Sequence, residues 1–175
     1  HGILHSFPTR RSSDLLDLAI KDIRRMIFAL HQPESQPLSE ELHDLVVSFA
    51  EPLGFTPRLT VVGPLDDPET VDEWLRLDLL AVIREALSNV ARHAQAGEVD
   101  VAVVVQADLV QVTVEDDGVG MIETGRRSGL ANLSERAAGR RGSLVVLSPM
   151  AVLGGTRVIW EVPASVGAGP TGDPL

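Results

Sequence analysis

The sequence predicts an α+β fold, a two-layer α/β sandwich in which helices cover one face of a mixed sheet. Two observations predict it. Short alternating runs such as 99–106 and 109–115 follow one another closely enough to pair as β-hairpins. Amphipathic helical stretches precede and separate the strand-like runs, and the longest, 75–96, repeats its apolar residues at helical spacing.

The composition restricts the functions that are possible. The chain of 175 residues has a net charge of −10 and holds no cysteine, which excludes disulfides and thiolate metal sites. It shows no basic stripe, so we expect no nucleic-acid partner. No apolar run approaches the roughly 20 residues that span a bilayer, so we expect no direct membrane contact and a cytoplasmic location.

The lysine content restricts how phosphate could bind. Lys21 is the only lysine, so the Walker A motif, which needs a lysine beside a glycine-rich loop, is impossible. Any bound phosphates must be neutralised by a metal ion, arginine and backbone amides. An acidic chain can still bind an anionic nucleotide when Mg²⁺ bridges the two.

The first residues are not expected to join the fold. We expect residues 1–14 to be a non-native or disordered arm, because the segment 6–15 resembles a translated sequencing adapter. Apolar residues then recur at helical spacing over 15–30 and predict an amphipathic helix whose stripe needs a partner. Pro33 and Pro37 end it with a short linker.

A second helix is predicted from Ser39, as N-cap, to about Leu53, with Gly54 at its end. The segment 58–63 then reads as a strand. The long helix follows, opening near Val71 and closing at Gly97. The residues of its apolar face are Leu79, Val82, Ile83, Ala86, Leu87, Val90, Ala91 and Ala94.

The opposite face of the long helix carries Glu85 and Asn89 one turn apart, so their side chains are neighbours. A carboxylate beside an amide can hold a metal ion and position a water. The alternative is an ordinary amphipathic helix with a solvated face. The elements predicted after it are the hairpin 99–106 and 109–115, a loop at 116–128, a helix at 129–138, strands at 143–147 and 156–162, and a disordered tail at 164–175.

The loop begins with Asp116-Asp117-Gly118-Val119-Gly120, where a strand ends. A strand can hold Asp116 rigidly, so that its carboxylate accepts a hydrogen bond from the exocyclic amine of adenine, a donor that guanine lacks at that position. Glycines let the backbone approach a ligand closely. The alternative is a simple Asp-Gly turn.

Two further segments are candidate ligand contacts. Gly129 opens a helix directly after a flexible loop, and free amides at a helix start bind phosphate, although Ser128 as a plain N-cap is an alternative. Gly154-Gly155 precedes the last strand, and Thr156 could add a hydroxyl to an adenine pocket. A hairpin turn is the alternative there.

Together these motifs resemble those of the GHKL (Bergerat-fold) ATPases, and more narrowly the catalytic domain of sensor histidine kinases of the NarL-type two-component branch. The segment Glu85–Ala94, EALSNVARHA, resembles the N-box, and Asp116–Gly120 the D-x-G-x-G box. Gly129–Leu133, GLANL, is similar to the second glycine box, and Gly155-Thr156 to the terminal G-T element. The resemblance covers 38–163.

The resemblance implies roles for these residues. Glu85 would act as general base or orient the acceptor, and Asn89 would ligate Mg²⁺. The loop 121–128 would be a lid over the nucleotide pocket. Arg92 or His93 would contact phosphate, Asp116 would read adenine, Gly118 and Gly120 would shape the pocket, Gly129 and Leu130 would meet the phosphates, and Thr156 would support adenine binding.

The implied function is the ATP-binding catalytic domain of a two-component sensor histidine kinase, acting with ATP and Mg²⁺. It would transfer the γ-phosphate to a histidine on a dimerisation domain outside this chain. Residues 15–32 would be the end of a dimerisation helix, so the chain would be a fragment of a homodimeric parent that acts on a response regulator. The alternatives are an anti-sigma-factor-type serine kinase of the same fold and a non-catalytic ATP-binding module.

The sequence departs from the family pattern at Arg127, where the second glycine box usually has an extra glycine. His43 lies in Glu-Leu-His-Asp, which mimics the phosphoacceptor signature. It falls on the first helix of the catalytic domain and in an exposed phase, so we do not expect it to be the acceptor. His31 is expected to be structural or solvated.

Overall fold

The computed structural model describes residues 36–120, 127–148 and 154–164, without the side chains of Arg127 and Ser128. The chain divides into two units, 1–36 and 37–175, and the fold below belongs to the second. Several expectations therefore lie outside the described residues. They are those for the arm, the dimerisation-helix end with His31, most of the lid loop, and the tail.

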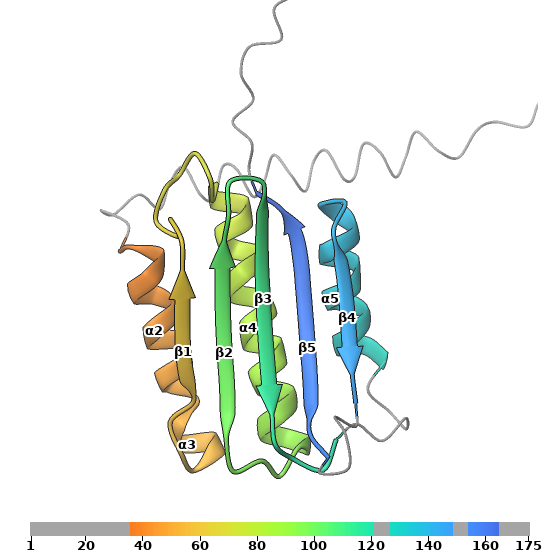
Figure 1. Cartoon of the computed structure of the whole chain (residues 1–175). Helices are drawn as coiled ribbons and strands as arrows, with labels where there is room; N and C mark the ends of the chain where they lie inside the picture. Colours follow the sequence, from red (N-terminus) through yellow and green to blue (C-terminus); the bar gives the residue numbers. More distant parts are fainter. Residues whose placement is uncertain (1–35, 121–126, 149–153, 165–175) are drawn as a thin grey trace, which may run out of the picture. The chain divides into compact units, whose positions relative to one another are not determined.

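Five strands form one mixed sheet in the order β1-β2-β3-β5-β4 (Figure 1). β1 pairs with β2 in parallel, and the other neighbouring pairs are antiparallel. The mixed sheet predicted from the sequence is confirmed. The strands are β1 (Arg58–Val62), β2 (Val99–Val105), β3 (Leu109–Asp116), β4 (Ser143–Leu147) and β5 (Thr156–Pro163).

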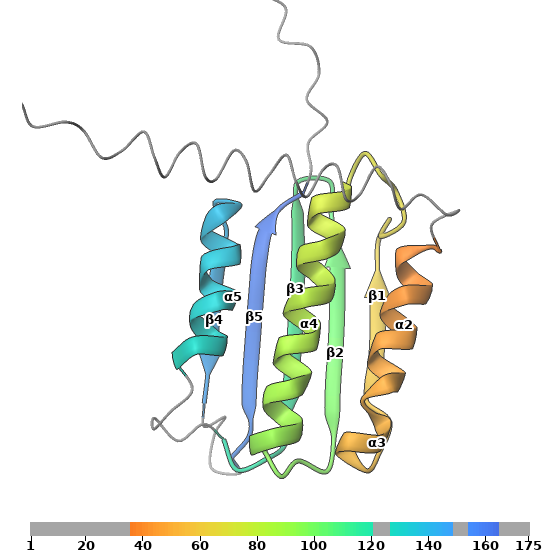
Figure 2. The same cartoon turned by 180° about the vertical axis from the view of Figure 1, so that it is seen from behind.

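Helices pack on one face of this sheet, as Figure 2 shows from behind. They are α2 (Leu38–Ser48), the short α3 (Ala50–Leu53), α4 (Glu73–His93) and α5 (Arg127–Gly139). This arrangement confirms the predicted two-layer sandwich. Among the described residues, none of the helices is long and apolar enough to cross a membrane.

The core lies between the two layers, because alternate strand residues face the helices. Val103 and Val110 are fully buried, as is Trp160 in β5. The apolar stripe of α4 meets them, and Ile83 and Leu87 have no exposed surface. Each such side chain contributes about 1.5–3 kcal/mol through burial, so the predicted stripe is what fixes α4 against the sheet.

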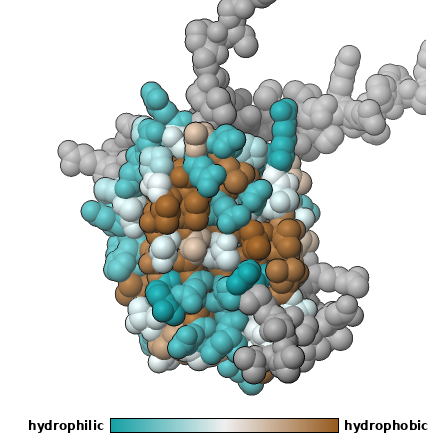
Figure 3. All heavy atoms as spheres, viewed as in Figure 1, coloured by the Kyte–Doolittle hydropathy of each residue, from teal (hydrophilic) through white to brown (hydrophobic). Residues whose placement is uncertain are grey.

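Within the described ranges, no helix covers the other face of the sheet. Figure 3 shows apolar and polar side chains interspersed there. Val62, Val145 and Leu147 are exposed by 53%, 44% and 46%. Arg157 pairs with Glu115 across β5 and β3 at 2.6 Å. This mixture is typical of a solvated sheet face.

The predicted second helix is wrong in two details. Ser39 is not its N-cap, because Pro37 holds that position and α2 begins at Leu38. The helix also does not run unbroken to Leu53, since α2 ends at Ser48 and α3 follows separately. Pro52 explains the break, because a proline in a helix clashes with the carbonyl four residues earlier, here that of Ser48.

Ser39 instead ties the start of α2 to the loop after β1. Its N–H donates to Asp66 Oδ1 at 2.9 Å and its hydroxyl to Asp66 Oδ2 at 2.6 Å. Burial raises the pKa of Asp66, but the hydrogen bonds from Ser39 and Leu38 and the charge of Arg76 together outweigh it and hold the pKa below its ordinary value. The carboxylate of Asp66 therefore clamps a helix start.

The long helix begins later and ends earlier than predicted. It does not open near Val71, because Asp72 is its N-cap and accepts a hydrogen bond from the N–H of Leu75 at 2.7 Å. It ends at His93 rather than at Gly97. The chain leaves the helix through Gln95, whose φ of +52° is rare for a residue other than glycine.

An ion-pair cluster joins α4 to α5. Arg136 donates to Asp78 Oδ1 at 2.7 Å, and Arg140 donates to Asp78 Oδ2 at 2.6 Å. The side chains of Asp78 and Arg140 are each only 20% exposed. Both oxygens of one carboxylate are thus used, which makes this pairing stronger than an ordinary surface ion pair.

Replacing Asp78 by Ala is expected to lower the free energy of unfolding by about 2 kcal/mol, because two charge-assisted hydrogen bonds are lost at a partly shielded place. Urea unfolding followed by circular dichroism measures this. Arg58→Ala is the control: Arg58 pairs with Asp100, but its side chain is 65% exposed, so a change below about 1 kcal/mol is expected. Equal losses in the two variants would contradict the role given to Asp78.

Candidate functional site

The residues predicted to form the site come from four separate elements. They lie at the C-terminal end of α4, the end of β3, the start of α5 and the start of β5. In both views these four ends lie at the same edge of the sandwich, the lower edge of Figures 1 and 2. The topology therefore brings together motifs that are far apart in sequence.

Gly129 packs directly against Glu85 and Asn89, the two residues of α4 that were predicted to hold a metal ion. A Cβ atom on Gly129 would lie 2.2 Å from Glu85 Oε1 and 3.5 Å from Asn89 Nδ2. Glu85 and Asn89 are both half-buried. Gly129 lies in the first turn of α5, where backbone N–H groups have no partner within the helix. A larger residue here would displace the Glu85 carboxylate.

The glycine-rich loop after β3 packs against the end of the same helix. The N–H of Val119 donates to the carbonyl oxygen of Ala94 at 2.8 Å. A Cβ atom on Gly118 would lie 2.2 Å from that oxygen. Ala94 follows Asn89 by five residues, about 7.5 Å along a helix. The N-box and the D-x-G-x-G box thus adjoin one another on α4.

Asp116 and Thr156 are the polar side chains buried in the described part of the chain, at 6% and 5% exposure. They face each other in the register of β3 and β5. Asp116 Oδ1 accepts from the N–H of Gly118 at 2.9 Å. The Thr156 hydroxyl lies 3.2 Å from that of Ser148. Burial of a carboxylate is costly, which is why such a group is typical of a ligand site.

The two glycines before β5 close the same region. Gly154 and Gly155 both have φ of +87°, which favours glycine. The N–H of Gly155 donates to the carbonyl oxygen of Gly118 at 2.5 Å. A Cβ atom on Gly155 would lie 2.3 Å from the carbonyl oxygen of Asp116. The predicted G-T element therefore packs on the D-x-G-x-G box.

The other predicted contact residues lie around this centre. Arg92 and His93 are exposed in the last turn of α4. Gly120 is buried and has φ of +79°, and Leu130 is half-buried in α5. His43 is exposed on α2, as its phase predicted. Their contacts with a ligand remain predictions.

Sequence reasoning missed three participants: the carbonyl of Ala94, the hydroxyl of Ser148 and the carboxylate of Asp117. A backbone carbonyl carries no sequence signal at all. Ser148 follows β4, and the predicted hairpin of β4 with β5 is confirmed, but that pairing alone does not show that the Ser148 hydroxyl reaches the hydroxyl of Thr156. Asp117 offered a signal, because the hairpin register sets it opposite Glu98, just after the long helix.

The donor set bears on whether a metal could bind. The described residues contain no group of three or more His, Asp or Glu side chains arranged around a metal. Asn89 and Glu85 nevertheless supply an amide oxygen and a carboxylate at one place. Mg²⁺ is bound by proteins through one or two such groups together with waters and substrate phosphates. The residues present fit that manner of binding.

A mixed five-stranded sheet with glycine-rich segments packed on the end of its central helix defines a nucleotide-binding domain of the GHKL type. Residues 75–166, over half of the chain, match the family described as Histidine kinase-, DNA gyrase B-, and HSP90-like ATPase. The chain belongs to this family. The family predicted from the motifs is confirmed, and the chain is an ATP-binding domain of that kind.

Two curated relatives are sensor proteins. The chain is 29% identical to the sensor histidine kinase LnrJ of Bacillus subtilis (strain 168) over 126 residues, 72% of this chain and 31% of that protein. It is 35% identical to the nitrate/nitrite sensor protein NarX of Escherichia coli (strain K12) over 114 residues, 63% of this chain and 18% of that protein. The chain thus spans less than a third of either relative.

A solved structure has the same fold. The blue-light activated histidine kinase EL346 of Erythrobacter litoralis superimposes with a TM-score of 0.58 at 24% identity, over 75% of this chain and 43% of that one. This likeness confirms the predicted fold class.

Proposed function

We propose that residues 38–163 bind Mg-ATP and transfer its γ-phosphate to a histidine on a dimerisation domain outside this chain. The observation that carries the proposal is the packing of Gly129 against Glu85 and Asn89, at the end of the helix that also receives Gly118. Phosphoryl transfer needs positioning and charge neutralisation more than covalent chemistry by the protein. A site assembled from rigid elements supplies such positioning.

The nucleotide would bind with its adenine and its phosphates at two ends of this region. Asp116, buried at the end of β3, would accept a hydrogen bond from the adenine amine, with Thr156 beside it. The phosphates would meet Asn89 and the free backbone amides around Gly129. Arg92 or His93 would contact phosphate, and Arg92 would add positive charge in a region without lysine.

Asn89 would hold Mg²⁺ together with phosphate oxygens. When bound, the ion would supply positive charge that stabilises the developing charge on the transferred group. Glu85 would take the proton of the acceptor imidazole or orient that ring. The bond between the γ-phosphorus and the β,γ-bridging oxygen would break, ADP would leave, and a phosphorus–nitrogen bond would form on the acceptor histidine.

The parent protein would supply what this chain does not. We infer a homodimeric, cytoplasmic kinase module in which 15–32 ends a dimerisation helix and a response regulator receives the phosphate. The names of the relatives favour a histidine kinase over a serine kinase of the same fold. His43 lies on α2, which packs on the sheet of the same domain, and this supports an acceptor elsewhere.

Replacing Asp116 by Asn tests the adenine assignment. The amide oxygen of Asn can keep the bond from Gly118, but its NH₂ group would face the donor amine of adenine. ATP should then bind about tenfold more weakly, the loss of one hydrogen bond to a charged group. Isothermal titration calorimetry with ATP and GTP measures both affinities.

The matched control for Asp116→Asn is Asp108→Asn, in the exposed turn between β2 and β3. It should leave both nucleotides unaffected. Equal weakening of ATP and GTP by Asp116→Asn would reject the reading of adenine by this residue. The proposed phosphate contacts of Asn89 and of the amides around Gly129 would not be affected by that result.

A further inference from the structure

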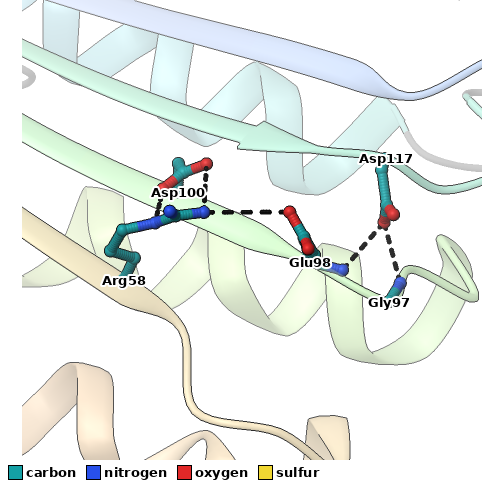
Figure 4. Close-up of polar contacts among 5 residues, drawn as sticks. All are labelled: Arg58, Gly97, Glu98, Asp100 and Asp117. Carbon is teal, nitrogen blue, oxygen red and sulfur yellow. Dashed lines mark hydrogen bonds and ion pairs between the residues drawn. The ribbon is translucent and has the colours of Figure 1, made fainter.

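The turn that follows α4 is held by a single side chain. The N–H groups of Gly97 and Glu98 both donate to Asp117 Oδ1, at 2.7 and 2.9 Å, and Figure 4 shows the carboxylate directed at both. The backbone N–H of Asp117 donates back to the carbonyl oxygen of Glu98 at 3.4 Å. Bonds from Glu98 and Gly97 hold the pKa of Asp117 below its ordinary value, so the carboxylate is ionised.

The turn needs such a tether because its backbone is not relaxed. Gln95, between the end of α4 and Gly97, has φ of +52°, a region that residues other than glycine rarely adopt. Strained conformations of this kind persist only where surrounding contacts impose them. The two hydrogen bonds to Asp117 are contacts of that kind on the far side of the turn.

The region proposed to bind adenine is attached to both sides of this turn. On one side, the carbonyl of Ala94 receives the N–H of Val119 and adjoins Gly118. On the other, Asp117 follows Asp116, whose carboxylate accepts from Gly118. A change in the turn would therefore move both the carbonyl of Ala94 and the backbone that carries Asp116.

We propose that Asp117 is a positioning residue for ATP binding: its carboxylate fixes the turn after α4 and thereby the place of the Asp116–Gly120 loop. The inference rests on the proposed function, since it concerns the adenine side of the same site. It adds a residue that the D-x-G-x-G pattern leaves unspecified.

Two substitutions separate the hydrogen bonds from the charge. Both donors converge on one oxygen, and the amide oxygen of Asn can accept two hydrogen bonds. Asp117→Asn therefore removes the charge and keeps the acceptor, whereas Asp117→Ala removes both. The pair is compared in the full 175-residue chain with ATP and ADP in calorimetry.

Asp117→Ala should raise the Kd for ATP and for ADP by about tenfold each, the equivalent of one lost charge-assisted hydrogen bond. Asp117→Asn should stay within about threefold of the unmodified chain, because neutral bonds are roughly half as strong. Hydrogen exchange measured by NMR should quicken at the amides of Gly118 and Val119 in Asp117→Ala.

The control is Asp66→Ala, which removes a similar carboxylate clamp beyond the other end of α4. The 21-residue helix separates the two places by about 30 Å. Asp66→Ala should lower the melting temperature and leave the Kd unchanged. An equal rise in Kd in Asp66→Ala and Asp117→Ala would show a general stability effect and overturn the inference.

Two other results would also overturn it. Equal effects of Asp117→Asn and Asp117→Ala would assign the effect to charge, and an unchanged Kd in Asp117→Ala would show that the tether does not govern binding. If the unmodified chain itself bound neither nucleotide, the proposed function would fail instead, and the hydrogen exchange at Gly118 and Val119 would still test the tether.

Discussion

A chain carrying Asn89→Ala is expected to bind Mg-ATP roughly 100-fold more weakly or not at all, a loss at the upper end of those found around metal sites. With no lysine beyond Lys21, few other groups can replace a metal-held contact to phosphate. Ala is the best helix former, so α4 should keep its stability. Calorimetry with ATP, with and without Mg²⁺, measures the change.

Gln106→Ala is the matched control, because Gln106 carries an exposed amide side chain in the turn after β2, outside the segments proposed to bind the nucleotide. It should bind Mg-ATP as the unmodified chain does. The difference in ATP affinity between Asn89→Ala and the unmodified chain should be smaller without Mg²⁺ than with Mg²⁺. Unchanged affinity in the presence of Mg²⁺ would reject the metal role of Asn89.

Gly118→Ala is expected to damage both the fold and the site. The added Cβ would lie 2.2 Å from the oxygen and 2.7 Å from the carbon of the Ala94 carbonyl, and these backbone atoms cannot move without moving the end of α4. Overpacking of this kind costs about 1–3 kcal/mol. We expect thermal unfolding at a lower temperature together with ATP affinity weakened by at least about tenfold.

Gly139→Ala separates this clash from a general effect of replacing glycine. Gly139 ends α5, and a Cβ there would meet nothing within 4 Å. That variant should unfold at or slightly above the temperature of the unmodified chain, since Ala favours helix more than Gly does. If Gly118→Ala had the same unfolding temperature and the same ATP affinity as Gly139→Ala, the close approach of Gly118 to Ala94 would not matter for stability or for binding.

The strands were predicted well from the sequence, and their chemistry explains why. The four strands after the long helix match their predicted bounds to within one residue at each end. Val-rich alternation encodes both the extended backbone and the face that is buried, so each strand carries its own signal. The order of strands in the sheet, with β5 between β3 and β4, has no comparable local signal.

Helix ends were predicted less well, because competing side chains decide them. Ser39 is a good capping residue, but Asp66, distant in sequence, takes both its N–H and its hydroxyl. Gly97 suggested the end of α4, yet Gln95 makes the turn. Tertiary hydrogen bonds of this kind cannot be read from local propensity.

The candidate site was predicted as a set of motifs, and the structure adds how they fit together. Glu85 and Asn89 were expected to be neighbours on α4, but their contact with Gly129 depends on the packing of α5. The D-x-G-x-G box packs against the G-T element because the strand order places β3 beside β5. Convergence of distant segments follows from the whole fold, so no single motif predicts it.

The strand order has a consequence for synthesis on the ribosome. β5 lies in the interior of the sheet but is the last strand to be made, and it carries the fully buried Trp160 as well as Thr156. Until it emerges, β3 and β4 lack the neighbour that lies between them. The nascent domain therefore completes its hydrophobic interior and its candidate nucleotide site in the same step, when β5 emerges.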